Sequence, residues 1–340
     1  MGGEIMAQYT DFIPQNVALS GALRIAIRDL KGNRVGQIPL GALTPPNPRK
    51  RLYSYNAFSD AHIVSDTGER DLDNALTYAD DNDDIAFSVI CGDLTSHGTT
   101  EQLARYKAIV DKHKKPVYAK PGNHEKYRET SSGYLSQYTG HPLYYTFEYG
   151  GDVFIMVGVI SDTEGNIFAD GELQWLYETL EANRNKRCFL FEHIPPVECS
   201  GDVLGIYPYT KLRNHTESVV FKSLLRHYKN IVFFHGHTHM QFSMQEYGGN
   251  ANYDNYFGIH SIHIPSLSVP RNVNADGTGY TTLYAESEGY VVDVYENGIH
   301  LRGRDFVKGE FLPIASYWLD TTLKTVEAGT YTDPTGTITT

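Results

Sequence analysis

Five short runs of apolar and aromatic residues, each bounded by Gly, Pro, Asn or Asp, predict buried β-strands. These runs are Tyr53–Ser59, Ile85–Cys91, Pro116–Lys120, Lys186–Glu192 and Ile231–His235. Helical spacing of apolar residues predicts three helices, which are Thr100–Lys114, Asp170–Asn183 and Thr216–Lys229. Asp170 has a side chain suited to a helix N-cap. Strands that alternate with helices predict an α/β layered body.

Turn signals predict additional strands around this alternation. The expected strands are Tyr144–Tyr149, Val153–Ile160, Ser261–Pro265, Gly289–Tyr295 and Ile299–Phe306. Gly150-Gly151 joins the first two, and Asn297-Gly298 is a strong hairpin turn between the last two. Two sheets that pack face to face and are flanked by helices would accommodate all of these elements.

The two ends of the chain differ from this body. Leu23–Arg28 alternates apolar and polar residues, Gly32-Asn33 supplies a turn and Val35–Leu40 is apolar again, so we expect an N-terminal β-hairpin. From about residue 311 the chain is polar and rich in Thr, and such a segment cannot fold alone. We therefore predict three parts, which are a hairpin extension with its linker (1–50), a body (51–310) and an extended tail (311–340).

A polar cluster follows each of the first five predicted strands. The clusters are Asp60-Ala61-His62, Gly92-Asp93, Gly122-Asn123-His124-Glu125, His193 with Pro195-Pro196, and Gly236-His237-Thr238-His239. Because open α/β sheets bind ligands beyond the carboxyl ends of their strands, we expect these side chains to meet in one crevice. The candidate metal ligands are Asp60, His62, Asp93, Asn123, His193, His237 and His239, with His124 as a spare imidazole.

The residue types in these clusters indicate a particular chemistry. Mixed imidazole and carboxylate ligands suit borderline ions such as Mn, Fe, Zn or Ni, whereas an all-oxygen set would indicate Mg or Ca. Two such ions, about 3.5–4 Å apart, can acidify a water and clamp phosphoryl oxygens. The alternative is that the His residues are ordinary core or surface groups. That alternative is weaker here because five matches follow five strands in order, and it is favoured for the nine other His residues.

The clusters resemble those of the calcineurin-like metallophosphoesterase superfamily, over roughly Leu52–Phe306. The resemblance implies a four-layer αββα sandwich that binds two divalent metal ions. The first ion would be held by Asp60, His62, Asp93 and His239. The second ion would share Asp93 as a bridging ligand and would also be held by Asn123, His193 and His237.

The same resemblance implies catalytic roles. Asp93 would bridge the two ions. A hydroxide that also bridges them would attack phosphorus in line with the leaving oxygen. His124 would not bind metal. Together with Asn123 it would contact the phosphate, and it would act as a general acid toward the leaving alkoxide. Glu125, where many relatives have Asp, would orient His124.

Two details narrow the branch of this superfamily. Gly92–Thr95 lacks the Tyr that purple acid phosphatases place shortly after the bridging Asp, which argues against a tyrosinate–iron site. Gly92–Gly98, a helix and then Lys120–His124 resemble the cyclic-nucleotide and glycerophosphodiester phosphodiesterase branch. We therefore expect a phosphodiesterase. A phosphomonoesterase that acts on proteins or nucleotides would have the same ligands and would differ in pocket width.

Three loop features are candidates for substrate contact. His97 follows a ligand cluster and is a candidate substrate-binding residue, although an ordinary loop contact would explain it equally well. Ser200–His215 and Tyr247–Phe257 are the longest loops, and the first of them directly follows the His193 cluster. We expect these two loops to select the substrate.

Composition and charge limit the possible partners. The chain has 340 residues and a net charge of −12, and its basic runs, Pro48–Arg51 and Lys112–Lys115, are short. This disfavours nucleic-acid polymers and favours a small anionic phosphoester that the metals attract. No apolar run approaches the ~20 residues that span a membrane, and no secretory signal is evident. We therefore expect a cytoplasmic protein without a membrane partner.

The flanks support a second hypothesis. Asn33–Leu40 and the Thr-rich tail resemble phosphoesterase-bearing proteins of bacteriophage and prophage. This implies a structural protein of the virion or its tail that keeps a phosphoesterase body. Such a protein would form a homo-oligomer or join a virion through residues 1–50 and 311–340, and it would then be located in the virion.

Overall fold

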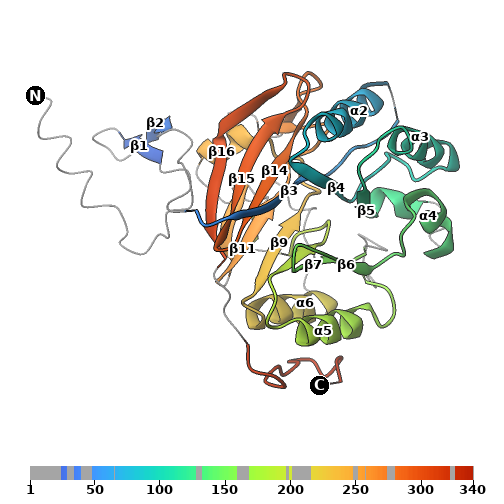
Figure 1. The fold of residues 1–340 in the computed structure, drawn as a ribbon, viewed down its shortest axis with the longest axis vertical. Coiled ribbons are helices and arrows are strands. Elements are labelled where there is room, and N and C mark those ends of the chain that lie inside the picture. Colours follow the sequence, from blue (N-terminus) through green and yellow to red (C-terminus); the bar gives the residue numbers. More distant parts are fainter. Residues whose placement is uncertain are drawn as a thin grey trace, which may run out of the picture.

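Two six-stranded sheets pack face to face, and helices cover their outer surfaces (Figure 1). This confirms the four-layer prediction. The computed structural model describes residues 24–28, 34–39, 48–64, 66–127, 132–158, 168–196, 199–200, 216–247, 252–256, 258–273, 280–321 and 326–339. In this part of the chain no helix is both long and apolar enough to cross a membrane.

The first sheet consists of three parallel strands on one side and three antiparallel strands on the other. It contains β3 (Arg51–Phe58), β4 (Ile85–Cys91), β5 (Val117–Lys120), β14 (Glu288–Tyr295), β15 (Gly298–Asp305) and β16 (Glu310–Asp320). The strand order is β16-β15-β14-β3-β4-β5. β3, β4 and β5 run parallel, so their carboxyl ends lie at one edge. β4 is an almost unbroken apolar run because both of its faces are covered.

The second sheet has a parallel centre with an antiparallel strand at each edge. It contains β6 (Tyr145–Tyr149), β7 (Asp152–Met156), β8 (Cys188–Phe191), β9 (Ile231–His235), β10 (Tyr253–Tyr256) and β11 (Ile259–His263). The strand order is β10-β11-β9-β8-β7-β6. β7, β8, β9 and β11 are parallel, so β8 and β9 also end at one edge.

Aromatic packing fills the space between the sheets. The rings of Tyr55 and Phe87 in the first sheet stack at 5.2 Å, and those of Phe154 and Phe189 in the second stack at 4.8 Å. Tyr55 meets Phe154 edge to face across the interface, with ring centres 5.3 Å apart. Burying such large side chains is the main source of stability for this core.

The helices form the two outer layers (Figure 1). α2 (Asp66–Asp81) and α3 (Thr100–Val110) cover the first sheet, and α5 (Glu172–Ala182) and α6 (Thr216–His227) cover the second. The prediction of Asp170 as an N-cap is wrong. The N-cap is Gly171, with φ 76° and no side-chain cap, and the Glu172 carboxylate instead accepts a hydrogen bond from the backbone N–H of Ala169.

The flanks have more structure than their composition suggests. β1 (Arg24–Arg28) and β2 (Arg34–Pro39) form an antiparallel pair, while the expected turn at Gly32-Asn33 lies outside the described residues. β16 lies in the stretch that we assigned to an extended tail, and it completes an edge of the first sheet. Farther on, Tyr331 and Ile338 are buried against the cluster that contains α5 and α6.

Candidate metal centre

The carboxyl ends of five strands bring the predicted ligands together. Asp60, Asp93 and Asn123 follow β3, β4 and β5, while His193 and His237 follow β8 and β9. Two groups of ligand atoms each lie within 4.8 Å of one another, namely those of Asp60, His62, Asp93 and His239, and those of Asp93, His193 and His237. Asp93 belongs to both groups, as a carboxylate that bridges two ions would.

Contact distances within the groups are short. The Nε2 atom of His239 lies 3.0 Å from Oδ1 of Asp60, and Nε2 of His193 lies 3.0 Å from Oδ2 of Asp93. Nε2 of His62 lies 3.7 Å from the same Asp93 oxygen. The imidazole nitrogens of the site therefore lie closest to two carboxylate oxygens, Oδ1 of Asp60 and Oδ2 of Asp93.

Three of these buried atoms lack ordinary hydrogen bonds. Within the described chain, Oδ1 of Asp60, Oδ2 of Asp93 and Nε2 of His193 are buried and, apart from these close approaches between candidate ligands, have no hydrogen-bond partner. Leaving such groups uncompensated is costly, so buried polar atoms of this kind call for a partner. A divalent cation would satisfy all three, and the mixed nitrogen and oxygen donors suit Mn, Fe, Zn or Ni.

Backbone carbonyls set the orientation of the imidazoles. Nδ1 of His193 lies 2.7 Å from the carbonyl oxygen of Cys91, and Nδ1 of His239 lies 3.2 Å from that of Val269. A carbonyl oxygen can only accept, so Nδ1–H donates in both bonds. In the neutral ring each Nε2 then carries the lone pair that a metal ligand requires.

The ligand loops adopt a strained backbone. Five non-glycine residues in the described chain have positive φ, and all five are candidate ligands, namely Asp60, His62, Asp93, His237 and His239. Such conformations cost free energy and persist where surrounding contacts enforce them. Here the loops bind one another, since the backbone N–H of His62 donates to the carbonyl of Asp93 at 3.0 Å.

Two motif glycines allow close approach of the loops. A Cβ on Gly122 would lie 2.2 Å from Oδ1 of Asp93, and a Cβ on Gly236 would lie 1.8 Å from Oγ of Ser59. Any side chain at these positions would displace the Asp93 carboxylate or the Ser59 hydroxyl. The glycines in the Gly-Asn-His-Glu and Gly-His-Thr-His clusters are therefore required for packing.

Burial and mutual charge determine the protonation of the centre. Burial alone would raise the pKa of Asp60 and Asp93, but the surrounding imidazoles hold the pKa of both well below the usual range. Burial lowers the pKa of His62 to about 3, whereas the two carboxylates outweigh burial and raise the pKa of His193 to about 9. The two ionised carboxylates thus favour a proton on the His193 imidazole. A divalent ion bound at the centre would take the place of that proton.

His124 lies at the open side of the centre, on the short helix η1 (Asn123–Tyr127). Its side chain is 31% exposed, its Nε2 lies 3.8 Å from Oδ2 of Asp93, and its backbone N–H donates to Oδ1 of Asp93 at 2.9 Å. Nδ1 of His124 donates to the carbonyl of Ser96 at 2.7 Å. Asn123, the remaining predicted ligand, is buried beside it.

Glu125, which we predict to orient His124, forms hydrogen bonds with two other loop residues. The Glu125 carboxylate accepts hydrogen bonds from the backbone N–H groups of Thr95 and Gly122, each at 2.8 Å. It therefore ties the loop after β4 to the loop after β5. Ser96, whose carbonyl orients His124, carried no signal for this role in the sequence.

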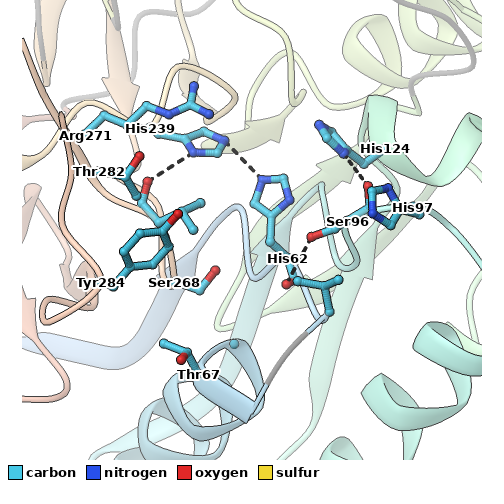
Figure 2. A pocket seen from close by; sticks show the side chains of 13 residues that line it. His62, Thr67, Ser96, His97, His124, His239, Ser268, Arg271, Thr282 and Tyr284 are labelled. Atoms are coloured by element: carbon cyan, nitrogen blue, oxygen red, sulfur yellow. Dashed lines mark hydrogen bonds between the residues drawn. The ribbon is translucent and has the colours of Figure 1, made fainter. Parts of the chain in front are cut away.

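A cavity of about 370 Å³ opens beside these imidazoles (Figure 2). Figure 2 shows His62 between His239 and His124, with His97 on the His124 side and Arg271 and Tyr284 on the His239 side. His97 lines the cavity, so its predicted substrate contact remains a proposal. Residues 201–215, 248–251 and 257 lie outside the described chain, so these parts of the two predicted substrate loops are untested. Arg271 and Tyr284 were not predicted from the sequence, because neither follows a ligand cluster.

Comparisons with known proteins agree with this geometry. The model of the calcineurin-like phosphoesterase family matches residues 56–241, more than half of the chain. A probable cyclic nucleotide phosphodiesterase from Fibrobacter succinogenes is 25% identical over 206 residues, which cover 58% of this chain and 77% of that protein. GAP50, the anchor in the inner membrane complex of Plasmodium, has a similar fold, with a TM-score of 0.54 at 12% identity over 82% of this chain and 91% of that one. The chain therefore belongs to the calcineurin-like phosphoesterase family and is a phosphoester hydrolase.

Proposed function

We propose that the chain is a phosphodiesterase that uses two divalent metal ions. The observation that carries this proposal is the position of Asp93, whose carboxylate belongs to both groups of ligand atoms. One ion would be held by Asp60, His62, Asp93 and His239, and the other by Asp93, Asn123, His193 and His237. When bound, the ions would supply positive charge for the phosphoryl oxygens and a nucleophile at neutral pH.

His124 is the candidate general acid. The carbonyl of Ser96 engages its Nδ1–H, so Nε2 is the nitrogen that can deliver a proton to the leaving oxygen. The ring lines the cavity and is partly exposed, which allows a substrate to reach it. Placing an acid beside the leaving group is typically worth about 10²–10⁴-fold in rate.

The preference for diesters is supported by the name of the Fibrobacter relative, a probable cyclic nucleotide phosphodiesterase. The test compares bis(p-nitrophenyl) phosphate with p-nitrophenyl phosphate, in chelator-treated protein to which Mn, Fe, Zn or Ni is returned. We expect metal-dependent turnover with kcat/KM at least tenfold higher for the diester. A preference for the monoester would instead support the phosphomonoesterase alternative, and equal inactivity on both would contradict the proposal.

The N-terminal hairpin supports assembly as a second role. β1 and β2 form a two-stranded sheet of their own, and the proposed role is that this pair docks on a neighbouring copy or on a virion. Light scattering of the whole chain and of a variant without residues 1–47 tests this role. An assembly that the deletion dissociates is expected for a virion protein. A monomer in both cases would contradict it and favour the cytoplasmic alternative.

A further inference from the structure

The wall of the cavity has an unusual charge balance for so acidic a chain. The chain carries a net charge of −12, yet none of the 13 described residues that line the cavity is Asp or Glu. Arg271 is the only Lys or Arg among them. The wall therefore does not repel an anion, and it offers one fixed positive charge besides any metal ions.

Arg271 is tied directly to the candidate metal centre. It begins the short strand β12 (Arg271–Val273), which pairs with β13 (Tyr280–Thr282). The backbone N–H of Arg271 donates to the carbonyl of His239 at 2.7 Å. Its guanidinium lies over the ring of Tyr280, 4.3 Å from the ring centre, which holds it in place by a cation–π contact. Figure 2 shows the guanidinium on the same side of the cavity as His239.

Aromatic and apolar groups gather at the same rim. In the described chain, seven large apolar or aromatic side chains are exposed, and two of them, Val64 at 45% and Tyr284 at 64%, line this cavity. A third, Tyr280 at 43%, stacks on Arg271. Exposed groups concentrated beside a cavity indicate a binding surface, and an exposed Tyr ring can stack on a planar ligand.

These observations define a recognition site for the part of the substrate that does not react. We propose that the cavity binds a phosphoester that carries a planar ring, with Tyr284 stacked on the ring and Arg271 paired with a phosphate oxygen. The hydroxyl groups of Thr67 and Thr282 also line the cavity and can bind polar groups on the ligand. This inference rests on the proposed function and assigns its specificity to the segment around β12 and β13. The ring is either a nucleobase or a simple aryl group, since both present the same flat apolar face.

Calorimetry on the metal-loaded protein tests the proposal with three phosphate monoesters. Adenosine monophosphate and phenyl phosphate carry a ring, whereas ribose 5-phosphate has no aromatic ring. We expect a ring-bearing ligand to bind about tenfold or more tightly than ribose 5-phosphate, as base stacking on aromatic side chains permits. Tight binding of adenosine monophosphate alone identifies a nucleobase, and tight binding of both ring-bearing ligands identifies a general aryl site.

Variants separate the two contacts. Tyr284→Ala should abolish the ring preference and leave the affinity for ribose 5-phosphate unchanged, while Tyr284→Phe should keep the preference. Arg271→Gln should weaken all three ligands by about tenfold to a hundredfold, and Arg271→Lys should restore part of that loss. Tyr149→Ala is the matched control, because Tyr149 is 41% exposed and lies on β6, outside the residues that line the cavity.

Three results would overturn the inference: equal binding of the three ligands by the wild type, a ring preference that survives Tyr284→Ala, or full affinity in Arg271→Gln. These results are distinct from failure of the proposed function. Metal-dependent turnover of bis(p-nitrophenyl) phosphate without any ring preference would remove this inference and leave the phosphodiesterase in place. Ring-selective binding without turnover on any ester would support this inference and contradict the phosphodiesterase function.

Discussion

The Nε2 atoms of His62 and His239 lie 3.1 Å apart, although 177 residues separate them in the chain. Burial lowers the pKa of both imidazoles, to about 3 for His62, so both are neutral at physiological pH. Nδ1–H of His239 donates to the Val269 carbonyl, which leaves a lone pair on the Nε2 that faces His62. Two ring nitrogens that converge in this way beside Asp60 could hold one cation.

Removing the His124 imidazole should separate chemistry from metal binding. We expect His124→Ala to keep its metal content and to lose about 10²–10⁴-fold in kcat on an alkyl diester, whose leaving group needs a proton. The loss should be much smaller on bis(p-nitrophenyl) phosphate, because p-nitrophenolate leaves without protonation. Equal losses on both substrates, or loss of metal, would contradict the role of His124 as general acid.

Gly122→Ala should weaken metal binding although no ligand is changed. The added Cβ would lie 2.2 Å from Oδ1 of Asp93 and would displace that carboxylate. We expect metal affinity to fall by about 10–100-fold, as for other changes that misplace a ligand. Gly140→Ala is the control, because its Cβ would meet nothing within 4 Å and it adds only the strain of a positive φ. Unchanged metal titrations in Gly122→Ala would show that the loops are more pliable than the structure indicates.

Glu288 should make stability depend on pH. Its carboxyl is buried on β14, and burial raises its pKa from 4.5 to about 8. The unfolded chain loses this proton at lower pH than the folded chain, so stability is full below about pH 4.5 and falls as pH rises to about 8. Urea unfolding at about pH 5 and about pH 9 should therefore show a smaller loss for Glu288→Gln than for the wild type. The exposed Glu310→Gln should follow the wild type, and identical pH dependence in all three proteins would refute this account.

Tyr331 should anchor the C-terminal segment. Its ring is buried against Tyr177, with ring centres 5.3 Å apart, and its hydroxyl lies 2.5 Å from Oγ of Ser223 on α6. Tyr331→Ala should lower the free energy of unfolding by about 3 kcal/mol through the cavity it leaves. The exposed Thr332→Ala should change it by less than about 0.5 kcal/mol. Similar unfolding curves for both variants would mean that this segment adds nothing to the body.

The central strands and ligand clusters were predictable because their signals are local. Ile231–His235 is predicted and observed with the same bounds, since a buried parallel strand is a short apolar run that ends abruptly at Gly236. α2 was missed because its sequence is largely polar, although Leu72, Leu76 and Ala79 have helical spacing and are buried. β16 was read as the start of a tail because a Thr-rich segment follows it closely.

The recognition residues and the contacts behind the ligands could not be predicted in the same way. Arg271 lines the cavity where it pairs with Met240, next to His239, a contact that depends on the tertiary fold, and Tyr284 lines it just after β13, the partner of β12. The hydrogen bonds of Glu125 also depend on how two loops meet, and neighbouring residues in the sequence do not reveal them. The sequence indicates which residues carry chemistry, and the fold determines what each of them touches.

Counting the metal ions bound per chain tests the central claim most directly. Elemental analysis of wild type and Asp93→Asn, each loaded with excess Mn and freed of unbound metal, should give two ions per chain for the wild type and fewer than one for the variant, because Asp93 belongs to both groups of ligand atoms. Asp111→Asn, an exposed change on the surface, should retain two. One ion or none in the wild type, or two ions retained by Asp93→Asn, would contradict a dinuclear centre bridged by Asp93.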